Sequence, residues 1–445
     1  MKKRLIATFA SAILLLTFTA CATQPTCSGE EMIAMEDKGF DQNRIEAMCM
    51  SRRLDIDGIT QVISTGVQAF AAVEQSKREA RTTAASMEKK ETKETAGSRT
   101  EEVAETILAP NSDYSTRSGK PLYQVWYGTN RKPTIEENPA KGFSDSRDLI
   151  LHYGYAYVNI PKSHKFGSIG SSWIVRTVTS TDDRLKIEGI RTLDHAQFIS
   201  ELQSSLYERK SGHRKALIYI HGYNVTFDKA VVQAAQIGYD LKVEGVTALF
   251  SWPSKGSLLG YAADEATVES SEGFLKEFLM RVALESGAEE VDVIAHSMGN
   301  RAFLRAVESL APALRNAGKK FGQIFLAAPD VDVDTFKRLA SIYPSISTRT
   351  TLYVSSKDLA LKGSVFLHEF DRVGFYPPTT TLPGIDTVQV SNVDLSLLGH
   401  GYYATTEAVL YDMFDLMRSN LAPHDRMRMH PLPSETKPEY WEIGP

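Results

Sequence analysis

The chain is poor in cysteine, carries no large excess of charge of either sign, and has only one long apolar run. Three cysteines among 445 residues are too few for a disulfide-rich scaffold and argue against a thiolate-rich metal site. A formal net charge of −5 gives no electrostatic basis for binding nucleic acid. Because the single apolar run lies at the N-terminus, a multi-span membrane protein is excluded as well. What remains is a globular chain that is long enough for one large domain with extensions.

The first 20 residues have the organisation of a bacterial lipoprotein signal peptide. A basic start precedes an apolar core, and the sequence Phe-Thr-Ala-Cys that ends at Cys21 resembles a lipobox, in which the cysteine is lipidated. Residue 22 is alanine rather than the aspartate that commonly retains such proteins at the inner membrane. We therefore expect a protein of the bacterial cell envelope, which a lipid anchor at Cys21 holds on the membrane at the periplasmic face of the outer membrane.

Two further segments precede the part of the chain that has the pattern of an enzyme. Residues 21–73 have helical apolar spacing and predict a small helical region, which a Cys27–Cys49 disulfide would staple in an oxidising compartment; two free buried thiols are the alternative. Residues 74–119 are rich in Lys, Glu, Thr, Ala and Ser, which predicts a charged flexible linker. The role and the protein partners of the helical region are not specified by this pattern.

Strands and helices alternate regularly from residue 120 to about 420, and residues 421–445 are predicted to form a C-terminal tail. Such alternation predicts an α/β fold with a mostly parallel central sheet flanked by helices and a functional site at the carboxyl ends of the strands. The expected strands are 123–131, 149–160, 171–180, 187–190, 216–220, 246–251, 291–294, 323–327, 350–354 and 387–390. The expected helices are 195–208, 227–243, 264–286, 300–310, 333–342 and 405–417.

The segment 289–304 predicts a strand, a sharp turn and a helix around one serine. Its strand is β-branched, and Ser297 in the turn has Ala295 two residues before it and Gly299 two residues after it. A nucleophile raised above a sheet on a strained turn needs small residues at those two positions, where backbone segments crowd. We therefore predict Ser297 as a nucleophile, with the N–H of Met298 available to a developing oxyanion.

A serine nucleophile needs a base, and the base needs an acid that orients it. In this order of elements the acid and the histidine should follow the serine. His400 lies between two glycines after the last expected strand, and we predict it as the base; the other downstream histidines, at 368, 424 and 430, lie in a packed-looking run or in the tail. Two acids compete. Asp358 occupies the more usual acid strand and is favoured, whereas Asp330 is an alternative acid that could instead cap the next helix or line the pocket.

The oxyanion hole requires a second N–H donor, and the sequence His-Gly-Tyr-Asn at 221–224 is a candidate source. It directly follows the apolar strand 216–220, and Gly222 allows the backbone to turn inward. The N–H of Tyr223 is therefore the predicted second donor, and His221 is expected to be a structural hydrogen-bonding residue. This machinery needs neither a metal ion nor an organic cofactor.

Seven short motifs in one order carry a resemblance to a known family. They are Tyr-Gly-Thr-Asn-Arg (127–131), His-Gly-Tyr-Asn (221–224), Phe-Ser-Trp-Pro-Ser (250–254), Ala-His-Ser-Met-Gly-Asn (295–300), Ala-Ala-Pro-Asp (327–330), Ser-Ser-Lys-Asp (355–358) and Gly-His-Gly-Tyr (399–402). Together they resemble an α/β-hydrolase family of the esterase/lipase superfamily that is catalogued as a domain of unknown function. The resemblance implies an α/β-hydrolase fold and the triad Ser297, Asp358 and His400.

The residues predict a serine hydrolase that cleaves carboxylic esters through an acyl-enzyme, with a small-molecule ester or a lipid as its substrate. Two alternatives stay open. One is an acyltransferase or thioesterase that uses the same triad, and the other is a non-catalytic, envelope-binding lipoprotein built on the same scaffold. The sequence does not specify the physiological substrate or its acyl chain length.

Overall fold

The computed structural model describes residues 115–117, 120–169, 184–257, 260–356, 361, 364, 370–390, 403–432 and 440–444. All of them belong to the second of two units into which the chain divides, Ile107–Pro445. The predicted signal peptide, the helical region with its three cysteines, most of the predicted linker and the expected strand 171–180 lie outside the described residues.

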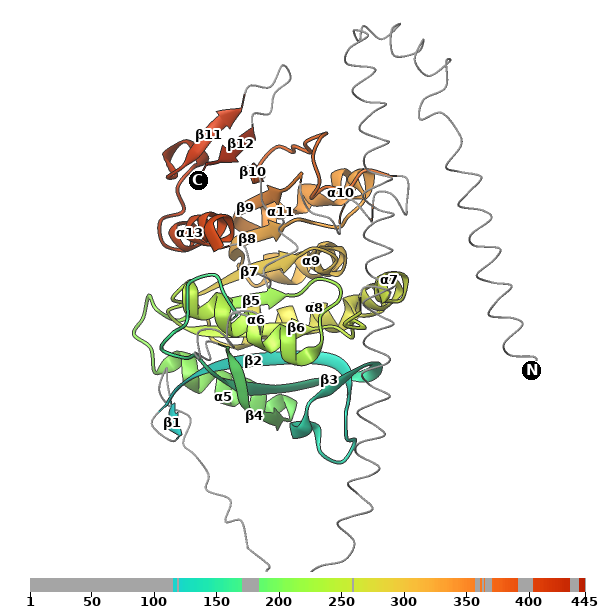
Figure 1. Cartoon of the computed structure of the whole chain (residues 1–445), viewed down its shortest axis with the longest axis vertical. Helices are drawn as coiled ribbons and strands as arrows, with labels where there is room; N and C mark the ends of the chain where they lie inside the picture. Colours follow the sequence, from blue (N-terminus) through green and yellow to red (C-terminus); the bar gives the residue numbers. More distant parts are fainter. Residues whose placement is uncertain are drawn as a thin grey trace, which may run out of the picture. The chain divides into compact units, whose positions relative to one another are not determined.

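The described strands form one 12-stranded sheet in the order β11-β12-β10-β9-β8-β7-β5-β6-β2-β3-β4, with β1 paired to β2. Figure 1 shows this sequence of strands running from β11 and β12 at one end of the domain to β4 at the other. In chain order the strands are β1 (Ser115–Arg117), β2 (Lys120–Pro133), β3 (Phe143–Asn159), β4 (Lys186–Leu193), β5 (Lys215–Ile220), β6 (Val246–Ser251), β7 (Glu290–His296), β8 (Phe321–Ala327), β9 (Ser347–Val354), β10 (Asp386–Val390), β11 (Met429–Leu432) and β12 (Tyr440–Ile443).

The strands from β2 through β6, β5, β7, β8, β9 and β10 to β12 are mutually parallel, and antiparallel pairs occur only towards the two ends of the described sheet. The main helices are α5 (His195–Tyr207), α6 (Phe227–Asp240), α7 (Tyr261–Ser270), α8 (Glu272–Met280), α9 (Gly299–Asn316), α10 (Val333–Leu339), α11 (Tyr343–Ile346) and α13 (Tyr403–Ser419). Shorter helical turns are η1 (Pro139–Lys141), η3 (Arg281–Glu285), η4 (Ala340–Ile342) and η6 (Pro423–Asp425). The predicted fold class, a mostly parallel sheet flanked by helices, is therefore confirmed.

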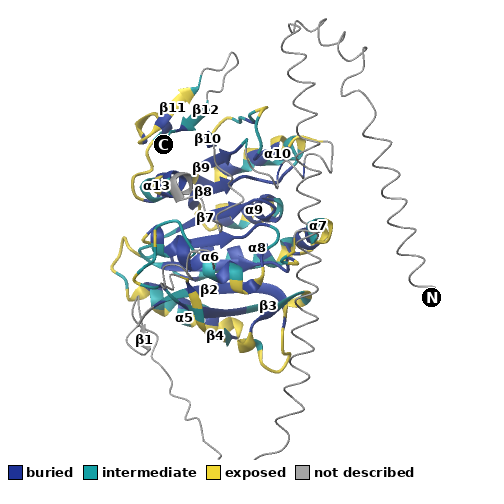
Figure 2. Cartoon of the chain, viewed as in Figure 1, coloured by how far each residue is buried: buried dark blue, intermediate teal, exposed yellow. Residues whose placement is uncertain are grey.

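Helices cover both faces of the sheet, so the central strands are apolar on both sides. On β5, Leu217 and Tyr219 pack in the core that includes α6 and α13, whereas Ile218 and Ile220 pack in the core that includes α5, α8 and α9. Successive side chains of a strand point to opposite faces, and this explains why the strand is a continuous apolar run rather than an alternating one. Figure 2 shows the result as buried central strands with exposed residues confined to the periphery.

The region predicted as one helix over 264–286 consists of two α-helices and a π-helical turn. α7 ends at Ser270, α8 begins at Glu272, and η3 follows directly after α8. The buried Ser271 lies at the junction, where its hydroxyl donates to the Thr267 carbonyl oxygen at 2.8 Å and accepts from the Asn130 amide at 3.0 Å. A serine that bonds back to the preceding turn tends to bend a helix, which accounts for the break at this position.

Part of the segment predicted as a C-terminal tail extends the sheet instead. β12 pairs with β10 in parallel, and β11 pairs with β12 in an antiparallel hairpin. These strands have only four residues each, and one of them contains Pro431. Short strands with a proline lack the period that identifies a strand in sequence, although an edge position tolerates the missing N–H.

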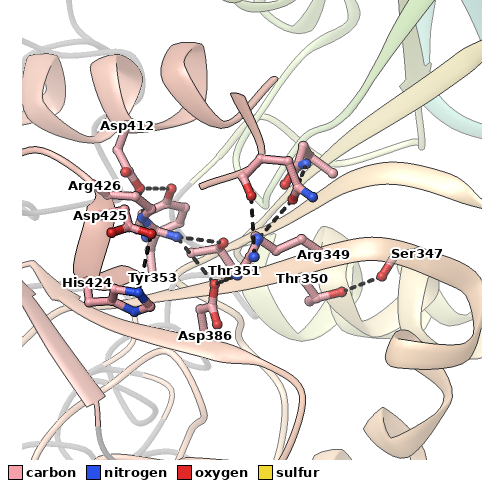
Figure 3. Close-up of polar contacts among 12 residues, drawn as sticks. Ser347, Arg349, Thr350, Thr351, Tyr353, Asp386, Asp412, His424, Asp425 and Arg426 are labelled. Carbon is pink, nitrogen blue, oxygen red and sulfur yellow. Dashed lines mark hydrogen bonds and ion pairs between the residues drawn. The ribbon is translucent and has the colours of Figure 1, made fainter. Parts of the chain in front are cut away.

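A buried polar cluster joins the C-terminal segment and α13 to the sheet, and Figure 3 shows its contacts. The Arg426 guanidinium, whose side chain is 1% exposed, donates to Asp412 on α13 at 3.0 Å and to Asp386 at the start of β10 at 3.4 Å. Asp412 also accepts from the Tyr353 hydroxyl of β9 at 2.6 Å. The cluster therefore fixes β9 and β10, which are the strands that precede the predicted acid and the predicted base.

Candidate active site

Ser297 lies at the carboxyl edge of the sheet, one residue beyond β7 and two residues before α9. Its backbone has φ +49°, in the left-handed region that non-glycine residues rarely adopt. The surroundings hold it there, since its N–H donates to the Ala327 carbonyl oxygen at 2.9 Å and its own carbonyl oxygen accepts from the Asn300 and Asp330 N–H groups at 3.1 and 3.2 Å. Strain of this kind persists only where the neighbouring structure determines it, and it clusters at active sites.

The small residues around the turn are needed because two backbone segments cross there. A methyl group on Gly222 would lie 2.9 Å from Cβ of Ser297, and a methyl group on Gly299 would lie 2.5 Å from the His221 carbonyl oxygen. Both distances are too short for a real Cβ contact. The loop after β5 therefore lies directly against Ser297 and against the start of α9, which explains why positions 222 and 299 need glycine.

The start of α9 supplies a positive electrostatic environment next to the serine. Met298 is the residue that precedes the helix, and it is completely buried. The first N–H groups of a helix are not used within it and carry the positive end of its dipole. The Asn300 side chain fixes the turn further, because its amide donates to the Ala295 and Ser297 carbonyl oxygens at 2.9 and 3.1 Å.

A buried carboxylate on α7 holds the loop that carries the predicted second donor. Asp264 is fully buried and accepts from the Asn224 N–H at 3.2 Å, the Lys255 N–H at 2.7 Å and the Ser254 hydroxyl at 2.6 Å. The Ser254 hydroxyl in turn accepts from the Val225 N–H at 3.0 Å. Two consecutive N–H groups of the 222–225 loop, those of Asn224 and Val225, are therefore held by Asp264 directly or through Ser254, immediately after the Tyr223 backbone.

His221 is a structural residue behind this loop rather than a second base. Its ring is fully buried and stacks on Trp252 with centroids 5.1 Å apart. Nδ1 donates to the Gly222 carbonyl oxygen at 2.7 Å, which leaves Nε2 to accept from Ser251 and Arg131 at 3.2 and 3.4 Å. Burial, reinforced by the charge of Arg131, lowers the pKa of His221 well below its usual value, so the ring is neutral near pH 7.

Arg131 is the positively charged residue among the side chains that support the 222–225 loop, and it is fully buried. Its guanidinium donates to the Val225 carbonyl oxygen at 2.7 Å, the Ser251 hydroxyl at 2.9 Å and the Ser144 and Ser254 carbonyl oxygens at 3.2 Å each. Burial lowers the pKa of Arg131 to about 9, which still leaves it protonated at neutral pH. The residue thereby connects the ends of β2 and β6 with the 222–225 loop that follows β5.

Asp330, the alternative acid, follows β8 and belongs to a dense polar cluster. It is 2% exposed, and its carboxylate accepts from the Tyr261 hydroxyl at 2.5 Å and from the Ser364 hydroxyl at 2.7 Å. The Arg301 guanidinium lies 3.3 Å from the same carboxylate, and the Arg372 guanidinium lies 3.6 Å from it. The carboxylate therefore fixes α7 and α9 around the serine turn. Capping of α10 falls to Asp332, which accepts from the Thr335 N–H at 2.8 Å.

The predicted acid Asp358 and the predicted base His400 lie outside the described residues. The strands that precede them are described. β9 ends at Val354 and β10 ends at Val390, both parallel to β7 and separated from it by one and two intervening strands. The triad itself thus remains a prediction, whereas Ser297, Met298, Tyr223 and the glycines come together at one edge of the sheet.

The sequence did not identify the residues that support the 222–225 loop, above all Arg131 and Asp264, or those that join Asp330 to the serine turn, above all Tyr261 and Arg301. The signal was present for Arg131, because it ends one of the seven motifs, and for Ser251, Trp252 and Ser254, which belong to another. The contacts of Arg131 with His221 and with Ser251 join positions 90 and 120 residues apart. Such pairings cannot be derived from local spacing.

The described part of the chain has neither a membrane-spanning helix nor a cluster of metal-binding side chains. None of its helices is both long and apolar enough to cross a membrane. No group of three or more His, Cys, Asp or Glu side chains in it is arranged to hold a metal ion.

The chain is similar to a curated protein and to several solved structures. Over 191 residues it is 23% identical to an uncharacterized protein, alr1448, of Nostoc sp. (strain PCC 7120), covering 37% of this chain and 46% of that protein, so it matches about half the length of its relative. A hormone-sensitive lipase from a metagenome library superposes with a TM-score of 0.29 at 12% identity, covering 52% of this chain and 94% of the lipase. An esterase of Pyrobaculum calidifontis gives a TM-score of 0.24 at 10% identity, covering 60% and 82%. TM-scores this low support no transfer of activity or of residue roles.

A family model described as "Alpha/beta hydrolase of unknown function (DUF900)" matches residues 196–419. The match begins in α5 and ends with α13, so it includes the 222–225 loop, the serine turn and the strands β5 to β10. It also spans six of the seven motifs that carried the resemblance in sequence. The chain therefore belongs to this family of α/β hydrolases.

Proposed function

We propose that the protein is a serine hydrolase that cleaves carboxylic esters through an acyl-enzyme intermediate. The observation that supports this most directly is the backbone of Ser297, which is held at positive φ between a buried parallel strand and a helix N-terminus. A serine without a chemical role would gain nothing from this conformation, which costs of order 1–3 kcal/mol. A left-handed residue between a strand and a helix is the kind of turn on which α/β hydrolases carry their nucleophile, and this supports the proposal.

In the proposed reaction the Ser297 hydroxyl attacks the ester carbonyl carbon while His400 takes its proton and Asp358 orients the imidazole. The carbonyl oxygen becomes an oxyanion that the Met298 and Tyr223 N–H groups stabilise. His400 then donates the proton to the departing alcohol, and the acyl group stays on Ser297. Water, deprotonated by His400, attacks the acyl carbon, and collapse of the second tetrahedral intermediate releases the acid and restores the serine.

The lengths of the chain segments are compatible with this triad. Parallel strands are roughly 4.8 Å apart, so the ends of β9 and β10 lie roughly 10 and 14 Å from the end of β7. Residues 355–358 can span roughly 13 Å, and residues 391–400 roughly 33 Å. The full engagement of Asp330 with Tyr261 and Ser364 favours Asp358 as the acid, since a carboxylate that already accepts two short hydrogen bonds has little capacity left for an imidazole.

A fluorophosphonate probe tests the proposal, because it phosphonylates only an activated serine. We expect labelling of the full chain in detergent, loss of labelling in Ser297→Ala, and retention in a matched control, Ser204→Ala, on the exposed side of α5. His400→Ala should lose hydrolysis of p-nitrophenyl esters by roughly 10⁴-fold or more, because members of a triad act as a unit. A folded wild-type protein that stays unlabelled would refute catalysis and favour the binding scaffold.

We also propose that a lipid on Cys21 tethers the enzyme to the cell envelope, with a membrane lipid or another ester as the substrate. The support is the lipobox-like sequence that ends at Cys21. Metabolic labelling with palmitate, followed by partition into the detergent phase of Triton X-114, tests it. Both signals should disappear in Cys21→Ser and persist in Cys27→Ser; a wild-type protein without incorporated label would contradict the anchor.

A further inference from the structure

Three arginines from two separate parts of the chain surround a small pocket beside the Asp330 cluster. Arg301 and Arg305 come from α9, and Arg372 comes from the segment between α11 and β10. The pocket has a volume of about 70 Å³. A water molecule occupies about 30 Å³ in the liquid, so the space is sufficient for a carboxylate or phosphate group.

Two of these arginines are already neutralised. Arg301 pairs with Glu265 and Asp330 and donates to the Tyr261 hydroxyl at 3.0 Å. Arg305 pairs with Glu272 at 2.8 Å and is half exposed to solvent. Neither guanidinium is therefore in need of a further anion.

Arg372 differs because it is buried and poorly paired. It is 5% exposed, and its Nε has no hydrogen-bond partner among the residues that the structure describes. Its one ion pair there is with Asp330 at 3.6 Å, beyond hydrogen-bond distance. The Asp330 carboxylate already accepts hydrogen bonds from Tyr261 and Ser364 and lies closer to Arg301. A buried guanidinium in this state is costly unless another acceptor completes its set of hydrogen bonds.

Two acidic side chains also line the pocket, and neither satisfies Arg372. Asp332 uses one carboxylate oxygen to cap α10, where it accepts from the Thr335 N–H at 2.8 Å, and the one ion pair of Arg372 within the described residues is with Asp330 instead. Glu269 has a 51% exposed side chain that can extend into solvent, and its partner is Arg305 at 3.8 Å. The pocket lining therefore contains three arginines and two acidic residues, and Arg372 keeps N–H donors that no described residue accepts from.

We propose that this pocket is an anion-binding subsite, separate from the oxyanion hole, in which the Arg372 guanidinium binds a carboxylate or a phosphate group. The planar fork of arginine matches both groups in a bidentate way. The subsite is connected to the nucleophile, since Arg301 lies four residues after Ser297 and the Asp330 N–H donates to the Ser297 carbonyl oxygen at 3.2 Å. If the proposed esterase activity holds, the anion belongs to the substrate, and the preferred esters carry a negative charge. The other source is a free anion that binds independently of the substrate.

Inorganic phosphate is the first probe, and it does not depend on catalysis. At constant ionic strength, phosphate should raise Tm of the full chain by about 2 °C or more, and equally in Ser297→Ala. The rise should be lost in Arg372→Gln, be partly retained in Arg372→Lys, and remain in Arg315→Gln, which removes an exposed arginine from the same helix as Arg301. If Arg372→Gln does not fold, Arg372→Lys against Arg315→Gln carries the comparison.

A matched pair of esters then identifies the source of the anion. The ratio of kcat/KM for p-nitrophenyl hemiglutarate to that for p-nitrophenyl butyrate should fall at least tenfold in Arg372→Gln and stay constant in Arg315→Gln. The ratio is independent of the fraction of folded enzyme. A phosphate effect that depends on Arg372 without a change in this ratio would assign the pocket to a free anion. If phosphate has no effect on Tm and the ratio is unchanged, the pocket holds only water and the subsite is refuted. Because the phosphate effect is measured in Ser297→Ala, failure of the esterase proposal leaves it interpretable.

Discussion

Replacing Asp292 by asparagine should stabilise the protein at neutral and alkaline pH but not in acid. Asp292 lies near the start of β7 and is completely buried. One carboxylate oxygen accepts from the Gln323 N–H at 2.6 Å, and the other has no hydrogen-bond partner among the described residues. Burial raises the pKa of Asp292 from 3.8 to about 7, and the charge of Glu290 adds to this, whereas the Gln323 N–H acts in the opposite direction.

The sign of the pH dependence follows from this shift. The folded protein holds the Asp292 proton more tightly than the unfolded chain does, so its stability contribution is complete below about pH 4. As the pH rises towards 7 the unfolded chain gives up the proton and the folded protein keeps it, and stability falls. Above about pH 7 both states are ionised and the dependence ends. A shift of about 3 pH units corresponds to a loss of up to about 4 kcal/mol, at about 1.36 kcal/mol per unit.

The asparagine variant keeps the acceptor for Gln323 and removes the ionisation. Its amide group takes the position of the oxygen that has no partner, which costs about 1–3 kcal/mol. We therefore expect Asp292→Asn to be equal to or less stable than wild type at pH 4.5, and more stable by about 1–3 kcal/mol at pH 8. The stability of the variant relative to wild type should change by about 4 kcal/mol at most between pH 4.5 and pH 8, and this change measures the ionisation of the buried carboxylate.

Urea unfolding followed by tryptophan fluorescence measures this difference. All four tryptophans lie after residue 120, so the signal reports on the α/β unit rather than on the N-terminal segments. The control is Asp334→Asn, the same substitution at an exposed position of α10. Wild type and Asp292→Asn with parallel stability curves from pH 4.5 to 8 would show that this carboxylate does not titrate within the folded protein, and the reasoning would be refuted.

Three further predictions concern the active site and its supports. Gly222→Ala should lower kcat for p-nitrophenyl butyrate by about 10²–10³-fold, the loss typical of one oxyanion donor, because the new methyl lies 2.9 Å from Cβ of Ser297. The control Gly273→Ala, whose new methyl has nothing within 4 Å, should keep wild-type kcat. Asp358→Asn should lower kcat by about 10⁴-fold with little change in Tm, whereas Asp330→Asn should lower Tm; a reversed pattern of kcat would make Asp330 the acid. Arg426→Gln should reduce the free energy of unfolding in urea by about 3–5 kcal/mol, because it leaves the buried Asp412 carboxylate without its cation, whereas Asp386 keeps Arg349. A loss below about 1 kcal/mol would contradict the buried ion pair.

The fold was largely predictable because most of its elements carry local signals. The strand, turn and helix at 289–304 were readable from β-branched residues, from two small residues and from helical spacing. The same holds for β6, which spans 246–251 both in the prediction and in the structure. By contrast, β12 has four residues and pairs with a strand about 50 positions earlier, so no window of sequence contains the information for it.

The site was predictable in its backbone and less so in its side-chain supports. Ser297 was identifiable because crowding at the turn dictates which neighbours are small. Asp264 was not, since an acid in a helix usually faces solvent, and its three partners on the 224–225 and 254–255 segments become neighbours only after folding. Arg372 gave no signal at all in sequence, because its significance depends on how little of its hydrogen-bonding capacity the fold uses.

The hydrogen bond from Ser297 to β8 has a consequence for the order of folding. The strand that carries the serine pairs with β5, which is synthesised earlier, and with β8, which is synthesised later. Ala327, the last residue of β8, accepts the bond that helps to keep the serine backbone left-handed. A partly made or partly refolded chain therefore contains the hydroxyl before it contains the support for its left-handed backbone. The probe labelling that the proposed function predicts for Ser297 should appear late in refolding, together with the pairing of non-local strands rather than with the first collapse.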